Sequence, residues 1–269
     1  MLTRITRPLA LLALVATTTL SGPGARASAP DLDPVPTPPM LLGGVFGPAV
    51  DESPYAGRAQ AARIFYQSRL PANLPRTANF REAYEQGVRT FVISWKDPDV
   101  ARVAVGLASL PDDVTVYGTY FHEPEDDIAR GRLTLADWTA RTNLQAVVMR
   151  ALDVVPTSLL MGFTVMGGKG RDVADYYAAD VDVFGFDYYP DKVGAAPTEV
   201  VARMAEAAQA SGSGRLLLGE FGILSGAADG SALVEEVRQA LVAAEAEVAT
   251  YFSRDLHTMT TSVADAWFA

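Results

Sequence analysis

The chain has 269 residues and a formal net charge of −10, from 32 acidic and 22 basic side chains. An acidic surface repels nucleic acid and anionic membranes, so the charge argues against both as partners and fits a neutral substrate more easily. The absence of cysteine excludes a disulfide framework, thiolate chemistry and a lipid-modified cysteine.

The first 29 residues have the pattern of an export signal. Arg4 and Arg7 give it a charged start, and residues 9–20 form an apolar run. That run is shorter than the ~20 residues that span a bilayer. Two Ala-x-Ala sites within residues 25–29 fit a signal-peptidase cut. We therefore expect residues 1–29 to be a signal peptide and the mature protein to be secreted, an uncleaved anchor being the alternative.

The next segment, residues 30–39, contains five prolines and is typical of a stiff, extended leader. The remaining residues, 40–269, have a length that suits one domain.

In that domain, short apolar runs alternate with longer amphipathic stretches. The predicted strands are residues 40–46, 63–66, 90–95, 114–122, 159–166, 181–189, 215–220 and 249–252. The predicted helices are residues 78–86, 100–108, 134–155, 173–179, 197–210, 232–245 and 262–268. Apolar strands separated by helices indicate a parallel sheet covered by helices, and eight strands favour closure into a single-domain (β/α)8 barrel.

Two glutamates stand at the ends of predicted strands. Glu123 follows the apolar strand of residues 115–121, and Glu220 follows residues 216–219. They are 220 − 123 = 97 residues apart. A barrel uses about 31 residues per unit, so three units take about 94. Both side chains are therefore expected at the carboxyl-end mouth of the barrel, where paired carboxylates hydrolyse glycosides.

Each glutamate also has a structural alternative. Glu123 begins an acidic stretch with Glu125, Asp126 and Asp127, and such a stretch is usually a solvated loop. Glu220 lies among apolar neighbours, where a buried carboxylate is costly without a compensating role, so the functional interpretation is stronger for it. His122 beside these acids suggests a metal site, but the His-Glu-x-x-His spacing is absent, so no metal or other cofactor is expected.

Three motifs resemble those of clan A retaining glycoside hydrolases, and most closely those of glycoside hydrolase family 26. They are Phe-His-Glu at residues 121–123, Val-Phe-Gly-Phe-Asp-Tyr-Tyr at residues 183–189, and Glu-Phe-Gly at residues 220–222. The resemblance implies that Glu123 is the acid/base and Glu220 the nucleophile of a hydrolase acting on a β-mannan-like or related β-glycan. It also implies supporting roles for His122 and Tyr189, with Tyr189 donating a hydrogen bond to the nucleophile.

The expected sugar contacts include aromatic residues at strand ends. Trp95 ends the third predicted strand and is the tryptophan best placed to stack on a sugar, while Trp138 and Trp267 are expected to be packing residues. On the eighth strand, Phe252 stands near the position where the clan often has a tryptophan.

Two polar residues have open interpretations. Asp187 either anchors a loop or binds a sugar hydroxyl, and Arg63 is either a substrate contact or a rim charge. The preferred function is a secreted, monomeric retaining glycosidase whose partner is a polysaccharide or oligosaccharide. The alternatives are a non-catalytic carbohydrate-binding barrel of the cell surface and an inverting hydrolase.

Overall fold

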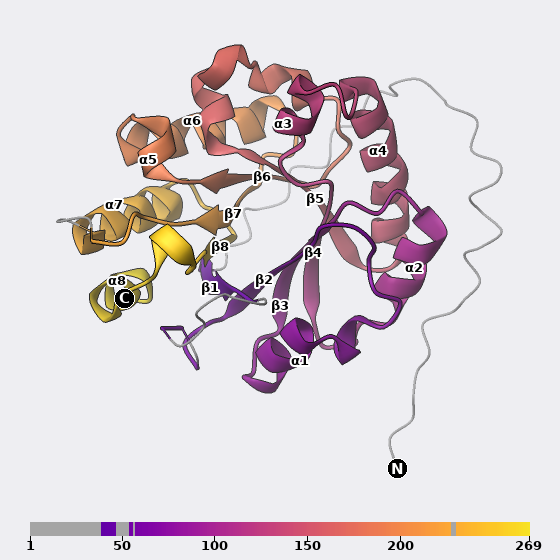
Figure 1. Ribbon diagram of the computed structural model, residues 1–269, viewed down its shortest axis with the longest axis horizontal. Coiled ribbons are helices and arrows are strands. Elements are labelled where there is room, and N and C mark those ends of the chain that lie inside the picture. Colours follow the sequence, from indigo (N-terminus) through magenta and orange to yellow (C-terminus); the bar gives the residue numbers. More distant parts are fainter. Residues whose placement is uncertain (1–38, 47–53, 56, 227–229) are drawn as a thin grey trace, which may run out of the picture. The chain divides into compact units, whose positions relative to one another are not determined.

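A computed structural model describes residues 39–46, 54–55, 57–226 and 230–269. Eight parallel strands pair in chain order, and β1 also pairs with β8, so that the sheet closes into a barrel (Figure 1). The strands are β1 (Leu41–Val45), β2 (Ala61–Tyr66), β3 (Thr90–Trp95), β4 (Thr115–Tyr120), β5 (Val154–Met161), β6 (Val183–Tyr188), β7 (Leu216–Phe221) and β8 (Val248–Tyr251). The predicted (β/α)8 barrel is confirmed.

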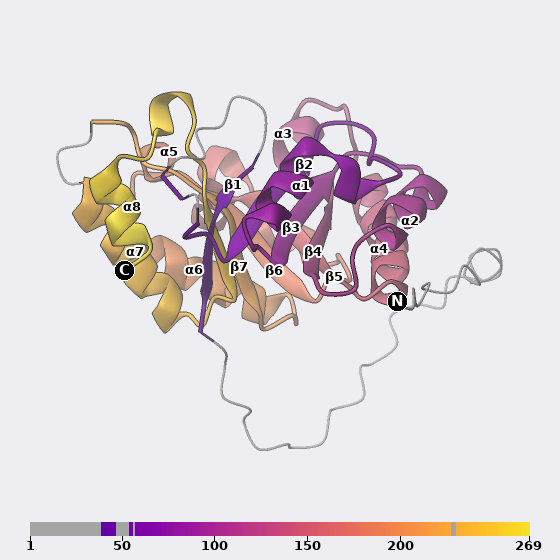
Figure 2. The same cartoon turned by 90° about the horizontal axis from the view of Figure 1, so that it is seen from below.

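Helices surround the strands, and α3 and α5 lie at the mouth, directly after β4 and β6 (Figure 2). The α-helices of the described residues are α1 (Ala78–Glu85), α2 (Val100–Ala108), α3 (Pro124–Ala129), α4 (Leu135–Ala151), α5 (Pro190–Val193), α6 (Pro197–Ala210), α7 (Gly230–Ala243) and α8 (Thr261–Trp267). The short 3-10 helices are η2 (Leu74–Arg76), η3 (Gly162–Met166), η4 (Gly168–Gly170), η5 (Val173–Tyr176) and η6 (Asp255–His257).

The predicted signal peptide, residues 1–29, and residues 30–38 of the predicted leader lie outside the described residues. Residues 39–269 form one compact unit. Within the part of the chain that the structure describes, no helix is both long enough and apolar enough to cross a membrane.

The alternation of side chains along each strand decides what lies inside the barrel. One apolar layer fills its interior, and it consists of Ala61, Val92, Tyr117, Leu159, Val183, Leu217 and Val248. Residues one position away face the helices and belong to a separate, larger core. Two positions further toward the mouth, the inward side chains become polar. Arg63, Ser94, Thr119 and Thr250 are all fully buried there.

The boundaries around β5 differ from the prediction. Helix α4 ends at Ala151 rather than at residue 155, and Asp153, with a φ of 55°, turns the chain into β5. The predicted strand 159–166 is the second half of β5 followed by η3. Parallel pairing with β4 overrides the predicted helical pattern at residues 154–155.

Candidate active site

The two glutamates meet at the mouth of the barrel. Glu220 is the fifth residue of β7, and Glu123 is the third residue after β4 and the one that precedes α3. Burial raises the pKa of Glu123 to about 7, with the negative charge of Glu220 as the next largest cause. The two carboxyl groups are therefore close enough to influence each other, although they come from strands on different sides of the barrel.

The backbone that carries Glu123 is unusual. Phe121 and Glu123 have φ values of 53° and 50°, in the left-handed region that non-glycine residues rarely adopt. Backbone hydrogen bonds hold this conformation, from the Phe121 amide to the Trp95 carbonyl (2.6 Å) and from the Glu123 amide to the Leu159 carbonyl (2.8 Å). The indole of Trp138 donates to the Phe121 carbonyl at 3.3 Å. Strain of this kind clusters at functional sites.

Glu220 is held by a donor and a cation. The Tyr189 hydroxyl donates to Glu220 Oε2 at 2.9 Å, the contact that the resemblance implies. Arg63 Nη2 lies 3.6 Å from Glu220 Oε1, and the Arg63 side chain is fully buried. Burial and the charge of Glu220 raise the pKa of Tyr189, so its hydroxyl keeps its proton and remains a donor. Tyr189 and Arg63 therefore hold one oxygen each of the Glu220 carboxyl group.

Arg63 and Ser94 belong to the arrangement around Glu220, which the sequence does not predict for either residue. Arg63 is neither a substrate contact nor a rim charge, because it lies inside the barrel beneath Glu220. Its Nη1 donates to Ser94 Oγ at 2.8 Å. The alternation of side chains along a strand could have identified both residues. Arg63 stands two positions after Ala61 and Ser94 two positions after Val92, so each points into the barrel as those residues do.

His122 extends this chain of contacts. Its Nδ1 lies 2.9 Å from Ser94 Oγ, and only 6% of the residue is exposed. Burial, followed by the charges of Arg63 and Lys96, holds the pKa of His122 well below its usual range. This contact joins the segment that follows β4 to β3.

Asp187 is a third carboxyl group at the mouth. It is 3% exposed, and neither of its oxygens has a hydrogen-bond partner among the described residues. Burial and the charge of Glu220 raise the pKa of Asp187 well above its usual range. A side chain at residue 219 would place its Cβ 2.5 Å from Asp187 Oδ1, so the close approach of β6 and β7 requires Gly219.

Glu125 is not the solvated loop acid that its sequence context suggests. It is 1% exposed, and its Oε1 accepts hydrogen bonds from the Met161 amide (2.7 Å) and from Thr164 Oγ1 (2.9 Å). Burial raises the pKa of Glu125 to about 7. Its carboxyl group thereby ties α3 to the end of β5 and to η3. Pro124 is the first residue of α3, and Glu125 lies in the first turn of that helix.

The expectation that Trp95 stacks on a sugar is wrong. Trp95 is fully buried, and its indole donates to Gln145 Oε1 of α4 at 2.6 Å. Its neighbour Ser94 faces the barrel interior, so Trp95 must face the helices. Trp138 and Trp267 are buried packing residues, as predicted.

Phe252 lies beside Tyr189, the residue that donates a hydrogen bond to Glu220. It is half-buried, and its ring meets that of Tyr189 edge to face at a centroid distance of 6.3 Å. A second aromatic, Phe163 of η3, is also half-buried and lines the mouth.

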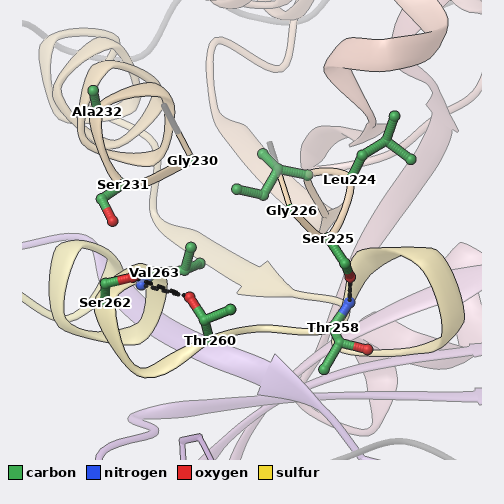
Figure 3. Close-up of a pocket in the computed structure, with 11 residues that line it drawn as sticks. Leu224, Ser225, Gly226, Gly230, Ser231, Ala232, Thr258, Thr260, Ser262 and Val263 are labelled. Atoms are coloured by element: carbon green, nitrogen blue, oxygen red, sulfur yellow. Dashed lines mark hydrogen bonds between the residues drawn. The ribbon is translucent and has the colours of Figure 1, made fainter. Parts of the chain in front are cut away.

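A hollow of about 290 Å³ opens beside Glu123, and we call it the Glu123 hollow. Its lining includes Glu123, Met161, Phe163, Asp187 and Tyr189. A separate hollow of about 390 Å³ lies near the starts of α7 and α8, where the Thr258 amide donates to Ser225 Oγ at 2.9 Å (Figure 3). That hollow is lined by apolar, glycine and hydroxyl residues and by none of the carboxyl groups, so it is not the site of the chemistry.

No protein-family model matches the chain, and no curated protein matches it. Solved structures with the same fold include glycoside hydrolases. The Cellulomonas fimi endo-β-1,4-mannanase of glycoside hydrolase family 26 is 15% identical with a TM-score of 0.55, over 82% of this chain and 66% of that chain. A family 128 endo-β-1,3-glucanase from Amycolatopsis mediterranei is 13% identical with a TM-score of 0.58, over 86% and 99%.

Cellulose synthase subunit Z from Clostridioides difficile also resembles this chain, with a TM-score of 0.59 and 12% identity over 86% of this chain and 100% of that chain. At these identities the likeness shows the fold alone.

Proposed function

We propose that the protein is a secreted retaining glycoside hydrolase that cleaves β-glycosidic bonds in a polysaccharide, a β-mannan or a related β-glycan. The observation that carries the proposal is the contrast between two facing carboxyl groups. Burial and a neighbouring negative charge raise the pKa of Glu123 to about 7, whereas Glu220 contacts Arg63 and the Tyr189 hydroxyl. Environments that separate a proton donor from an ionised carboxylate are typical of glycosidases.

The proposed reaction has two displacements. Glu220 attacks the anomeric carbon while Glu123 transfers its proton to the departing glycosidic oxygen, which gives a covalent glycosyl-enzyme and a free sugar end. Glu123, now ionised, then takes a proton from water, and that water displaces Glu220 and restores both residues. The Tyr189 hydroxyl and the Arg63 guanidinium orient the Glu220 carboxylate for attack and receive it when it leaves.

The assignment to glycoside hydrolase family 26 rests on the three motifs and is part of the proposal. The Phe-His-Glu segment carries the proton donor in strained backbone, and Tyr189 contacts Glu220. The likeness to a family 26 mannanase supports the fold that the assignment requires.

A non-catalytic carbohydrate-binding barrel is the alternative. A binding protein has no need for a proton donor facing an ionised carboxylate, and each such buried group lowers stability. The discriminating experiment is a screen of the purified protein against β-mannan, β-xylan and β-glucans, with release of reducing ends as the readout. Glu123→Gln and Glu220→Gln are the matched inactive variants, because each keeps the size of its side chain. Release that both variants abolish supports the hydrolase; binding of a glycan without release supports the alternative.

A further inference from the structure

The lysines of this acidic chain are concentrated at the mouth of the barrel. The sequence has three lysines among 22 basic residues, and all three follow the carboxyl ends of strands. Lys96 follows β3, Lys169 lies in η4 after β5, and Lys192 lies in α5 after β6. Two of them, Lys169 and Lys192, line the Glu123 hollow.

Lys192 differs from the other two lysines in its partners. Lys96 pairs with Asp127 and Lys169 pairs with Asp126, each at 3.3 Å. Lys192 has no ion-pair partner among the residues that the structure describes, and its Nζ lies 4.1 Å from the centroid of the Tyr189 ring. The charge of Lys192 acts on Glu123 by lowering its pKa, against the larger effect of burial. An unpaired ammonium group therefore stands close to the proton donor.

Two cations lie beside Phe163, which lines the same hollow. Lys169 Nζ lies 4.8 Å from the centroid of the Phe163 ring, and the Arg171 guanidinium lies 5.1 Å from it. Asp126 is the ionised acid beside them, and it is shared among Lys169, Arg171 and Arg130. A single carboxylate is therefore shared among three cations, so none of the three has an acid to itself among the described residues.

An adjoining hollow of about 460 Å³ is bordered by the same side chains. Phe163, Lys169, Lys192 and Val193 line both hollows. An aromatic side chain and two ammonium groups that line one hollow offer an apolar surface to a sugar ring and charge to its substituents. Neutral sugars need no such cations.

We infer that the sugar bound in the Glu123 hollow carries an anionic group, a uronate carboxylate or a sulfate, which Lys192 and Lys169 bind. The inference deepens the proposed function and rests on it in one respect, the position of that sugar. The hollow is lined by Glu123 and not by Glu220, and Glu123 protonates the departing oxygen, so the anionic sugar lies on the leaving side of the cleaved bond. The net negative charge of the whole chain favours a neutral substrate at long range, and the lysines reverse that preference locally.

The test measures binding to the Glu220→Ala variant, which the proposed mechanism leaves unable to cleave its ligand. Titration calorimetry compares β-linked mannuronate and glucuronate oligosaccharides, sulfated cello-oligosaccharides, and neutral manno- and cello-oligosaccharides of equal length. We expect one anionic series to bind at least about tenfold more tightly than the neutral ones, the size of one charge-assisted hydrogen bond. The series that binds more tightly identifies the anionic group.

Lys192→Gln and Lys169→Gln in that background should each remove about tenfold of the anionic affinity, and added salt should weaken binding as well. Neutral ligands should be unaffected. Arg203→Gln is the control, because it removes the same charge from an exposed position on α6 that lines neither hollow. Its effect on affinity should be less than about twofold.

The outcomes separate the two proposals. If anionic oligosaccharides bind no more tightly than neutral ones or do not bind, or if Lys192→Gln matches Arg203→Gln, the inference is overturned, even when the wild-type protein hydrolyses neutral β-glycans. Lysine-dependent binding of an anionic series without hydrolysis by the wild-type protein supports the anionic site and contradicts the proposed function.

Discussion

Glu123 and Glu220 show how neighbours give one residue type two chemical roles. Glu220 has a buried guanidinium and a phenol hydroxyl within reach, and both stabilise a negative charge. Burial and the charge of Glu220 both disfavour the ionised form of Glu123, which raises its pKa to about 7. The sequence places both residues at the mouth, but it does not show the cation below Glu220, because Arg63 comes from a distant strand.

The raised pKa of Glu123 predicts the alkaline side of the pH profile. Below about pH 7 Glu123 carries the proton that the leaving oxygen needs, so kcat/KM should fall as pH rises through that value. The measurement is kcat/KM against pH with a natural-type oligosaccharide. With an aryl glycoside whose leaving group needs no proton, the fall near pH 7 should be absent for formation of the glycosyl-enzyme. The same fall with both substrates would remove Glu123 from the role of proton donor.

At the scale of the elements, the short segments after β4 and β5 determine the shape of the mouth. Glu125 joins them through the Met161 amide and Thr164, and the left-handed residues at the end of β4 aim Glu123 across the opening. These contacts are what a local sequence pattern does not reveal, since they connect residues about three dozen positions apart in the chain.

The buried carboxyl group of Glu125 should make stability depend on pH. Its folded-state pKa of about 7 lies above its ordinary value of 4.5, so the folded state binds more protons between these values. Stability contributed by this group is therefore complete below about pH 4.5 and is lost as pH rises through 7, by on the order of 3 kcal/mol. Glu125→Gln keeps an acceptor oxygen and removes the charge.

Calorimetric melting at pH 5 and pH 8 tests this dependence. Relative to the wild-type protein, Glu125→Gln should gain stability at pH 8 compared with pH 5. An equal difference in melting temperature at both pH values would show that Glu125 is not titrating in the folded state.

Trp95 should be a residue of the core that joins β3 to α4. Trp95→Ala removes a fully buried indole and leaves Gln145 without its donor, so the free energy of unfolding should fall by about 3–5 kcal/mol. Val147→Ala is the control on α4, because Val147 is 54% exposed and should change stability by less than about 0.5 kcal/mol. Chemical denaturation measures both. A loss of glycan affinity at unchanged stability would return Trp95 to the binding surface.

For the whole molecule, the order of the strands and the closure of the sheet follow from the sequence pattern. The pattern does not show which side chains of each strand point into the barrel and which point toward the helices. Eight apolar runs separated by helices predict a closed parallel barrel, and that prediction is confirmed. In a parallel barrel both faces of a strand are buried, so apolar content does not distinguish them. For this reason the sequence predicts Trp95 at the sugar-binding mouth, whereas it packs against α4. The position of Arg63 inside the barrel can be recognised only when the inward-pointing residues of β2 are known.

Export is the prediction that concerns the entire chain. The charged start at Arg4 and Arg7, the apolar run and the Ala-x-Ala sites predict cleavage after Ala27 or Ala29. Mass spectrometry of protein from the culture medium should find the new amino terminus at Ser28 or Pro30. Recovery of the full-length chain from the cytoplasm alone would contradict it.

The most direct test of the central claim is the configuration of the product that azide forms with Glu220→Ala. Removal of the nucleophile should lower turnover of an aryl β-glycoside by several orders of magnitude, and azide in its place should restore it by direct attack, giving the α-glycosyl azide. Glu123→Ala is the matched control, because its glycosyl-enzyme still forms and azide should then give the β-glycosyl azide. Nuclear magnetic resonance of the isolated products distinguishes the two. An α-azide from Glu220→Ala is the result that the account predicts, and a β-azide or undiminished turnover without azide would contradict it.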